Sequence, residues 1–236
     1  LPTAGSPVRF SRVAYCPTAA RSYEKIVVTL SDDGYLDAYV FDGTSWTVTN
    51  NIGYVGTTAN ANKSFDVAYE KTSGEAILVY AITSTNTSRD LAYKTWTFGT
   101  GWSGESYIND TGHTTDIQYN WVSLASKPTS GSNEIALVGI DGTNSDTVAW
   151  IWDGSNWGNM KELTASVSIA TEECIAVAYE QTSGYATFVS STSTNAFSWQ
   201  WSGSAWDASA TTFDLSGAST PNWFTLKANP INDELF

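Results

Sequence analysis

An aromatic residue, a turn of small residues and a tryptophan recur together four times along this chain of 236 residues. The tryptophans that close the four turns are Trp46, Trp102, Trp157 and Trp206, separated by 56, 55 and 49 residues. Repeats with a period of roughly 50 residues indicate an array of similar small units, each of which buries its apolar face against its neighbours. This period constrains the fold more than any other feature of the sequence.

A longer period connects every second repeat. Glu24 and Glu134 occupy matching positions 110 residues apart, and so do Tyr69 and Tyr179 in the repeats between them. Two types of repeat therefore alternate, and an unfinished repeat of the first type occupies 222–236. Because the types alternate, a closed ring should contain an even number of units, and we expect six or eight. The missing units would lie in a longer protein or come from another chain.

Each repeat contains four short runs with the composition of β-strands. In the second repeat these runs cover 64–69, 76–81, 91–98 and 102–108, and they are rich in valine, tyrosine, tryptophan and threonine. Such residues suit a pleated, half-buried surface, and glycine-, serine- and threonine-rich turns separate the runs. Four antiparallel strands in one short repeat are typical of a β-propeller blade. A string of separate sandwich domains would have too few residues per core, and the coils of a β-solenoid are shorter.

The sequence thus predicts an all-β chain that forms a single β-propeller domain, or part of one, over residues 1–236. Four blades and an incomplete fifth, about four and a half in all, are expected at about 8–50, 64–109, 120–163, 174–213 and 222–236. The third strand of each blade carries aromatic residues two positions apart, such as Trp150 and Trp152, which share one face of the sheet. We interpret these aromatic side chains as packing between blades, without a ligand.

Composition excludes several classes of partner. The net charge is -13, and the eleven basic residues are scattered, which argues against binding to nucleic acid or to anionic membrane surfaces. No apolar run approaches the length of a membrane-spanning helix, and no signal peptide is recognisable. The acidic, polar composition is typical of extracellular or cell-surface β-proteins, so we expect an exported protein whose leader has been removed or lies upstream.

Three glycosylation sequons occur, at Asn62, Asn86 and Asn109. They are candidate acceptor sites in an exported protein. Chance produces such tripeptides at a comparable rate in a chain this rich in serine and threonine, and both interpretations stay open.

Catalytic chemistry has little support in the sequence. The single histidine, His113, lies in a polar loop and lacks the companions that a zinc site requires. Glu70 and Glu180 occupy equivalent positions in two repeats, which indicates an architectural role, since an active site needs its groups in one place only. We therefore predict no catalytic residues and no enzyme. Asp66, Glu70 and Glu180 remain candidate ligand-binding carboxylates at the end of the central channel.

One turn resembles part of a calcium-binding loop. Asp33 and Asp37 flank Gly34 and Tyr35 with the spacing of the second half of such loops, but the two earlier ligand positions carry uncharged residues. A hairpin turn with Asp-Gly at its centre explains the same residues. We expect no cofactor, with calcium at Asp33 and Asp37 as the alternative.

The two cysteines, Cys16 and Cys174, fall about six residues apart on equivalent first strands. Six residues of β-strand are far beyond disulfide reach. We predict two unpaired, mostly buried thiols.

The repeated turn resembles two known families of propeller. Asp42-Gly43-Thr44-Ser45-Trp46 is similar to the Asp-box hairpin of sialidase-type propellers but lacks the spacer between aspartate and glycine. The blades also resemble those of fucose-binding lectins, in which a strand ending in an aromatic residue is followed by glycine and tryptophan. That resemblance implies sugar binding between blades through an arginine, a glutamate and a tryptophan. The four arginines of this chain do not recur at one repeat position, which leaves no functional residue to transfer.

Two hypotheses about function follow. The first is a non-enzymatic extracellular or cell-surface propeller that acts as a structural, adhesive or protein-interaction module, through a protein partner or self-assembly. The alternative is a carbohydrate-binding propeller, a lectin or a glycoside hydrolase, which uses channel-end carboxylates such as Asp66 and Glu70 to bind glycans.

Overall fold

The structure is a computed structural model that describes residues 6–56, 61–83, 89–109, 118–167, 170–192, 194–215 and 220–236. The elements whose bounds are described are antiparallel β-strands and a short 3-10 helix, Ala19–Arg21. The chain divides into two compact units, Leu1–Val122 and Ser123–Phe236. Each unit is described by itself below.

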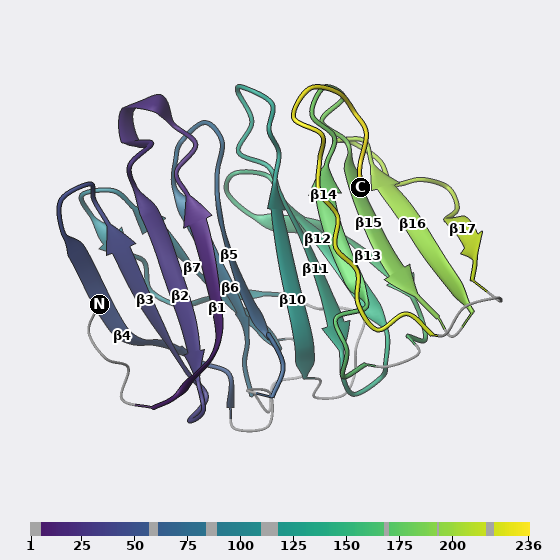
Figure 1. Ribbon diagram of the computed structural model, residues 1–236, viewed down its shortest axis with the longest axis horizontal. Helices are drawn as coiled ribbons and strands as arrows, with labels where there is room; N and C mark the ends of the chain where they lie inside the picture. Colours follow the sequence, from purple (N-terminus) through teal and green to yellow (C-terminus); the bar gives the residue numbers. More distant parts are fainter. Residues whose placement is uncertain are drawn as a thin grey trace. The chain divides into compact units, whose positions relative to one another are not determined.

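The first unit contains two sheets, and strands that follow one another in the sequence are paired in both (Figure 1). The first sheet has the order β1 (Val8–Tyr15), β2 (Lys25–Ser31), β3 (Tyr35–Phe41), β4 (Trp46–Tyr54). The second comprises β5 (Phe65–Tyr69), β6 (Ala76–Ala81), β7 (Leu91–Thr97), β8 (Gly101–Trp102) and β9 (Ser106–Ile108). Strands β8 and β9 both pair with β7, so they are two halves of one outer strand.

The other two sheets repeat this plan. The third consists of β10 (Tyr119–Ser126), whose first residues precede the boundary between the units, β11 (Ile135–Asp141), β12 (Thr147–Trp152) and β13 (Trp157–Thr164). The fourth consists of β14 (Ile175–Tyr179), β15 (Ala186–Ser191), β16 (Asn195–Trp201) and β17 (Thr211–Asp214). Four sheets of four strands in consecutive order confirm the predicted blades. The strand predicted at 76–81 coincides with β6.

The outer strand of the second blade is less regular than predicted. We expected one strand at 102–108, but Ser103–Glu105 separates β8 from β9. The hydroxyl of Ser103 accepts a hydrogen bond from the Thr95 backbone N–H at 3.0 Å, and the Ser103 N–H donates to the Thr95 carbonyl at 2.8 Å. A side chain that takes a place in the ladder interrupts the regular pairing of the strand.

The repeated turn joins the third and fourth strands of each blade and pairs two aromatic rings across them. The ring centroids are 5.1 to 5.5 Å apart in the four pairs, Phe41–Trp46, Trp96–Trp102, Trp152–Trp157 and Trp201–Trp206. Tilted rings at this distance are a favourable aromatic contact. The period read from the sequence is therefore the period of a cross-strand aromatic pair.

The side chain that precedes the glycine closes this turn. Oδ1 of Asp42 accepts hydrogen bonds from the backbone N–H groups of Thr44 at 2.8 Å and Ser45 at 2.7 Å. Gly43 has a φ of 99°, which a residue with a side chain rarely adopts. The Asp-Gly pair is thus explained by the geometry of the turn.

Inner strands supply the core of each unit. All residues of β5, β6, β11, β12 and β14 are buried. The largest fully buried side chains include Trp150 in the second unit and Tyr80 in the first. Cys16 and Cys174 are both buried and are not joined in a disulfide, as predicted.

The segment 222–236 makes the contacts of a first strand. The Phe224 N–H donates to the Glu173 carbonyl at 3.0 Å, and the Val122 N–H donates to the Lys63 carbonyl in the equivalent way at 3.1 Å. Lys227 and Phe236 then exchange two backbone hydrogen bonds of 2.9 Å. These contacts resemble those of a first strand, and the incomplete fifth blade stays a prediction.

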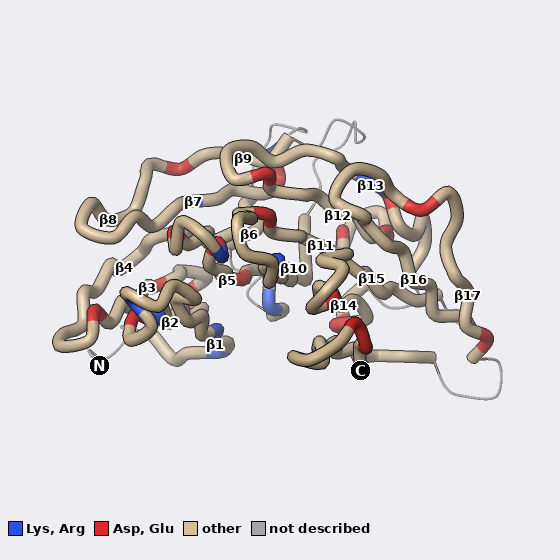
Figure 2. The backbone as a smooth tube through the Cα atoms, turned by 90° about the horizontal axis from the view of Figure 1, so that it is seen from above, with Lys and Arg blue, Asp and Glu red and all other residues tan. Residues whose placement is uncertain are grey.

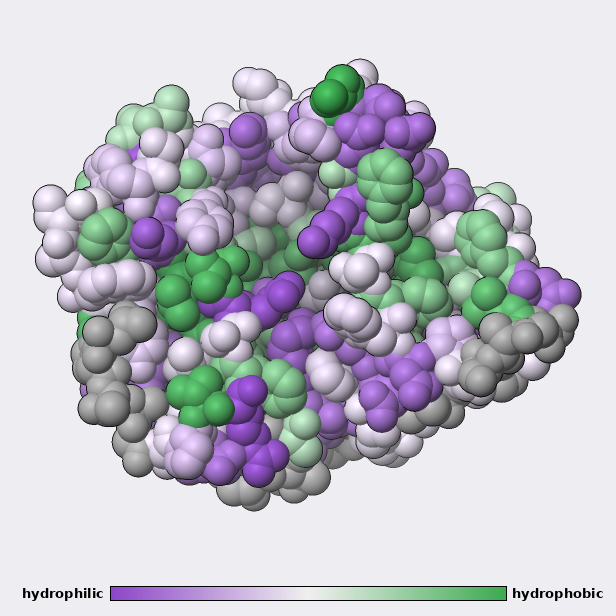
Figure 3. Space-filling model, viewed as in Figure 1, coloured by the Kyte–Doolittle hydropathy of each residue, from purple (hydrophilic) through white to green (hydrophobic). Residues whose placement is uncertain are grey.

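Acidic residues along the chain and apolar residues on one face of the molecule show no segregation in the two views that colour them. Aspartates and glutamates occur along both units without gathering on one element (Figure 2). On the face shown in Figure 3, hydrophilic and apolar residues are interspersed. Within the described ranges, no helix has the length and apolar character needed to cross a bilayer.

Candidate functional site

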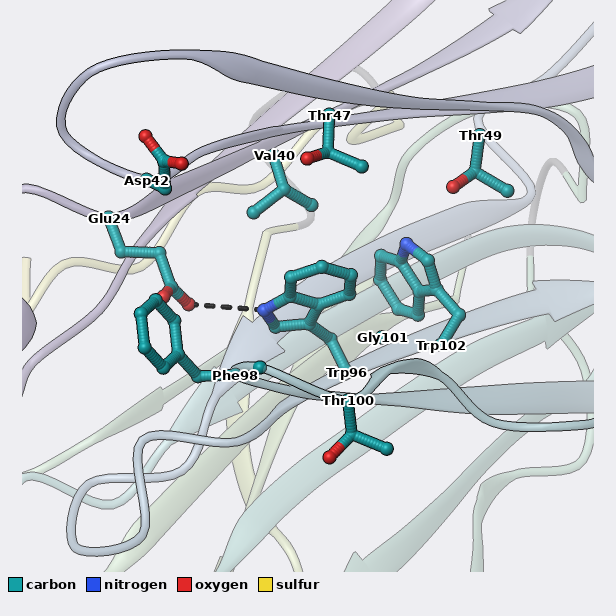
Figure 4. Close-up of a pocket in the computed structure, with 11 residues that line it drawn as sticks. Glu24, Val40, Asp42, Thr47, Thr49, Trp96, Phe98, Thr100, Gly101 and Trp102 are labelled. Atoms are coloured by element: carbon teal, nitrogen blue, oxygen red, sulfur yellow. Dashed lines mark hydrogen bonds between the residues drawn. The ribbon is translucent and has the colours of Figure 1, made fainter.

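A cavity of about 590 Å³ lies between the first and second blades, within the first unit (Figure 4). One wall comes from the first blade and the other from the hairpin that joins β7 to β8. Its lining consists of Glu24, Val40, Asp42, Thr47, Thr49, Trp96, Phe98, Gly99, Thr100, Gly101 and Trp102. Aromatic faces with a few polar groups are typical of small-ligand sites, and the volume lies within their usual range.

A buried carboxylate lies at the inner end of this cavity. Glu24 has no exposed surface, and its Oε1 accepts hydrogen bonds from the Tyr69 hydroxyl at 2.9 Å and from Trp96 Nε1 at 3.3 Å. Burial and the neighbouring Glu24 carboxylate raise the pKa of Tyr69 well above its ordinary value, so the tyrosine remains a donor. Glu24 therefore connects the two blades that form the cavity.

An arginine balances this carboxylate. Arg21 Nη1 lies 3.4 Å from Glu24 Oε2, and Nη2 donates to the Ser73 carbonyl at 3.0 Å. The guanidinium also lies 5.1 Å from the centre of the Phe98 ring, which is within the range of a cation–π contact. A Cβ atom on Gly74 would come within 2.1 Å of Arg21 Nη2, so this glycine makes room for the arginine.

Trp96 and Trp102 form the aromatic wall. The indole of Trp96 is held by Glu24, whereas Nε1 of Trp102 is buried without a hydrogen-bond partner among the described residues. In Figure 4 this nitrogen points towards the side of the cavity that carries Thr47 and Thr49. Burying a donor without a partner costs about 1 to 3 kcal/mol. A ligand hydroxyl placed here would remove that cost.

A second carboxylate lies at the mouth of the cavity. The N–H groups of Ser45 and Thr44 hold the pKa of Asp42 well below its ordinary value of 3.8. Asp42 is exposed and stays ionised at neutral pH. It can accept hydrogen bonds from a ligand but cannot act as a proton donor.

The second unit repeats this arrangement with different contacts. Glu134 accepts hydrogen bonds from the Tyr179 hydroxyl at 3.0 Å and from Lys127 Nζ at 3.3 Å. The indole of Trp206, which corresponds to Trp102, donates to the Asn159 carbonyl at 2.9 Å. The lysine thus replaces the arginine, and the matching indole is satisfied by the protein itself.

The three predicted ligand-binding carboxylates lie outside the cavity lining. Asp66 is 2% exposed and forms two hydrogen bonds with Arg12, at 2.8 and 3.0 Å. Glu70 is equally buried and accepts from the Ser73 hydroxyl. Glu180 accepts from Gln200 Nε2 at 2.6 Å. Nothing tests their predicted role in ligand binding, which stays a prediction.

The two candidate calcium ligands line a separate, polar cavity of about 500 Å³ in the first blade. Asp33 accepts from the Ser6 hydroxyl at 2.7 Å, and Asp37 accepts from the Asn51 backbone N–H at 2.8 Å. Over the described ranges no three acidic, histidine or cysteine side chains are placed to hold a metal ion. Asp33 makes the contacts of a turn residue, and Asp37 makes its contact where the pairing of β3 with β4 is irregular.

Two of the three sequons lie in the described part of the chain. Asn62 is half-buried and Asn109 is exposed, whereas Asn86 lies outside the described residues. His113 also lies outside them. Use of the sequons stays a prediction.

Sequence reasoning missed the cavity for a physical reason. Its groups come from adjacent blades, with Glu24 and Trp96 separated by 72 residues, and the tryptophans were interpreted as packing alone. The sequence also gave no reason to place Arg21 at a site. The basic residue beside Glu134 in the second unit is Lys127, which occupies a different repeat position from Arg21. The recurrence of Glu24 and Glu134, each near a basic residue, is the signal that could have found it.

Comparison with known proteins identifies the fold of the chain but not its family. No family model matches the chain, and no curated protein matches it either. Among solved structures, a six-bladed fucose-recognising lectin of Aleuria aurantia is similar with 16% identity and a TM-score of 0.54 over 93% of this chain. A variant of AofleA from Arthrobotrys oligospora is similar over 100% of this chain, with 11% identity and a TM-score of 0.61.

A third similar structure is the intramolecular trans-sialidase of Ruminococcus gnavus, with 13% identity and a TM-score of 0.51 over 85% of this chain. The chain spans 60 to 68% of the lectin and AofleA structures and 45% of the trans-sialidase. Six blades, as in the Aleuria lectin, is one of the two ring sizes that the alternating repeats predict. The chain folds as a β-propeller that resembles fucose-binding lectins and sialidase-type propellers.

Proposed function

We propose that this chain is a carbohydrate-binding propeller that holds a neutral sugar in the cavity between its first and second blades. The observation that carries this proposal is the pair of tryptophans, Trp96 and Trp102, beside the buried Glu24. Tryptophan faces bind the apolar faces of sugar rings, and carboxylates and indole N–H groups bind their hydroxyls. Fucose-binding lectins among the similar structures support the same ligand class.

The charges around the cavity favour a neutral sugar. Glu24 and Asp42 both line it, and the nearby guanidinium of Arg21 is already engaged by Glu24 and the Ser73 carbonyl. An acidic sugar would bring a third negative charge next to two carboxylates, which is unfavourable. Neutral sugars such as fucose are therefore the expected ligands, and sialic acids and uronic acids are not.

Binding without catalysis is also part of the proposal. Glycoside hydrolysis generally requires a carboxylic acid that donates a proton and a second carboxylate. Of the two carboxylates in the lining, Glu24 is held by Arg21, Tyr69 and Trp96, and Asp42 stays ionised because its pKa is lowered. If the chain has an adhesive role, the cavity would carry it out by binding glycans on another surface. The extracellular location of the chain stays a prediction.

Calorimetric titration with methyl α-L-fucoside and a panel of neutral and acidic monosaccharides tests the proposal, after a glycan array has ranked them. We expect saturable binding of a neutral sugar and none of the acidic ones. Trp102→Phe, which keeps the aromatic face but removes the indole N–H, should weaken binding about threefold to tenfold, the equivalent of one neutral hydrogen bond.

Trp206→Phe is the matched control, because its indole donates to Asn159 in the second unit. This variant should leave the affinity unchanged. No binding by any neutral glycan, or equal losses in the two variants, would sink the proposal.

A further inference from the structure

The outer strands of the first and third blades contain extra residues in different places. In the first blade, Ala38 pairs with Thr49 and Leu36 with Gly53, so that Asn50, Asn51 and Ile52 stand opposite the single residue Asp37. Such an insertion is a β-bulge, which bends its strand and redirects the groups next to it. The part of β4 that lies beside the cavity is regular.

The third blade divides its two extra residues between two places. One of them, Leu163, falls between the partners of Val148 and Thr147, and the other lies nearer the start of β13. Ile151 pairs with Gly158 and Ala149 with Lys161, so that one extra residue falls at Asn159 and Met160. Asn159 has a φ of 51°, and its carbonyl accepts the hydrogen bond from Trp206. The bulge therefore provides the partner that the Trp206 indole needs.

One side chain at the bulge of the first blade has no polar counterpart in the third. Asp37 is 7% exposed, and its Oδ1 accepts a hydrogen bond of 2.8 Å from the N–H of Asn51, which has a φ of 53°. A charge-assisted bond to a backbone N–H is stronger than a neutral one, and it stabilises the bulge opposite Asp37. The matching residue in the third blade is Val148, whose side chain can accept no hydrogen bond, and only one of the two extra residues lies beside it.

We infer that Asp37 is a positioning residue for the sugar site. By fixing the bulge opposite itself, it keeps β4 regular where β4 faces the cavity, and no strand carbonyl reaches Trp102. The Trp102 N–H then stays available for a ligand hydroxyl, whereas Trp206 is satisfied by the protein. The role of Asp37 in affinity rests on the proposed function, but its effect on the Trp102 indole does not.

The inference is tested by the indole N–H resonance of Trp102 in ¹H–¹⁵N NMR spectra of the ligand-free chain, assigned with Trp102→Phe. Asp37→Val copies the third blade and should let the bulge move towards the cavity. The Trp102 indole proton should then shift downfield and exchange more slowly with solvent, because it gains a carbonyl partner. Asp37→Asn retains an acceptor for Asn51 and should leave the resonance unchanged.

Thr29→Val controls for a change in buried polarity, because Thr29 pairs with Asp37 across β2 and β3 and makes no bond to Asn51. It should leave the resonance unchanged. If Asp37→Val does not fold, Asp37→Ala removes the same acceptor with a smaller change of volume. An unchanged Trp102 resonance in the folded variant that lacks the acceptor overturns the inference.

Sugar titrations of the same variants separate this inference from the proposed function. Asp37→Val should weaken sugar binding about threefold to tenfold, and Asp37→Asn should restore it. A shifted indole resonance in a chain that binds no sugar would refute the proposed function and support the role of Asp37 in the bulge. Full affinity in Asp37→Val with a shifted resonance would overturn the role of Asp37 in the sugar site.

Discussion

The first pair of blades and the second pair share a sequence plan but use their indole N–H groups in opposite ways. In the first pair Trp96 donates to Glu24, and Trp102 has no partner among the described residues. In the second pair Trp206 donates to Asn159, whereas the indole N–H of Trp201, which matches Trp96, has no hydrogen-bond partner among the described residues. The same tryptophan motif therefore serves packing in both pairs and leaves a donor facing a cavity in the first.

The basic residues beside the two buried glutamates also differ between the pairs. Arg21 contacts Glu24, the Ser73 carbonyl and the Phe98 ring, whereas the described ion pair at Glu134 is made by Lys127. An arginine has five donors in a fixed plane, while a lysine is a flexible point charge. The comparison teaches that repeats can conserve a carboxylate while the groups around it decide whether a binding site forms.

The largest difference between the pairs is expected when the carboxylates are removed. Glu24→Ala leaves Arg21, Tyr69 and Trp96 without their acceptor in a fully buried place, and should lower the free energy of unfolding by about 3 to 5 kcal/mol. Glu134→Ala should cost less, because its side chain is 14% exposed and water can replace it in part. Urea denaturation of both variants measures the difference.

Labelling of the buried thiols shows which of the two units is destabilised by a substitution. Cys16 is 4% exposed in the first unit and Cys174 is fully buried in the second. Thiol labelling of the Glu24→Ala variant should therefore reach Cys16 at lower urea concentration than Cys174. An equal loss of stability in the two glutamate variants would break the comparison.

A smaller effect is expected at the glycine beneath the arginine. Gly74 has a φ of 69°, and an added Cβ would lie 2.1 Å from Arg21 Nη2 and 2.9 Å from Thr18 Cγ2. Gly74→Ala should therefore lose about 2 to 3 kcal/mol of stability and displace the guanidinium from Phe98. Gly131→Ala is the control, because Gly131 has a similar φ of 86° but nothing within 4 Å. Thermal unfolding and sugar titration of both variants should show a loss of affinity for Gly74→Ala only.

The tyrosines that bind the carboxylates should behave alike. Tyr69 and Tyr179 donate to Glu24 and Glu134 over 2.9 and 3.0 Å, so that Tyr→Phe should cost about 1 to 2 kcal/mol in either pair. Equal losses at the two tyrosines would mean that the two pairs of blades differ in their basic residues and indole N–H groups, and not in the tyrosine hydrogen bonds. A loss at Tyr69 several times larger than that at Tyr179, measured by urea denaturation, would contradict it.

The smallest effect concerns the turns. In the first pair Asp42 accepts the N–H groups of Thr44 and Ser45, whereas in the fourth blade the Ser202 hydroxyl accepts the Ala205 N–H at 3.1 Å. Because the pKa of Asp42 is lowered on folding, its stabilisation is present above the ordinary value of 3.8 and is lost as the pH falls below it.

Asp42→Ser copies the turn of the fourth blade and removes this pH dependence. The wild-type chain should melt at a higher temperature than the variant at neutral pH, and the difference should shrink towards about pH 3. A constant difference in Tm across this range would show that the ionised carboxylate is not what stabilises the turn.

The fold could be predicted from the sequence because its signal is local and repeated. Each hairpin can be recognised in one short segment, because its closing tryptophan pairs with an aromatic residue five or six positions earlier. The four tryptophans are Trp46, Trp102, Trp157 and Trp206. The break between β8 and β9 could not be predicted, since it depends on Ser103 taking a place in the ladder.

The site could be predicted only in part. The family resemblance pointed to an arginine, a glutamate and a tryptophan between blades, but it could not say that Arg21, Glu24 and Trp96 are the residues that meet. That meeting depends on how two blades pack. The role that we propose for Asp37 depends on a strand irregularity, whereas the sequence suggested this residue as a calcium ligand. Contacts between neighbouring units and irregularities within a strand leave little trace in a single sequence.

A crystal structure of the chain with the neutral sugar that ranks first on the glycan array tests the central claim most directly. The account predicts a sugar between β4 and the β7–β8 hairpin, stacked on the tryptophan wall, with one hydroxyl within hydrogen-bonding distance of Trp102 Nε1. A sugar bound elsewhere on the chain, with this cavity left empty, would contradict it.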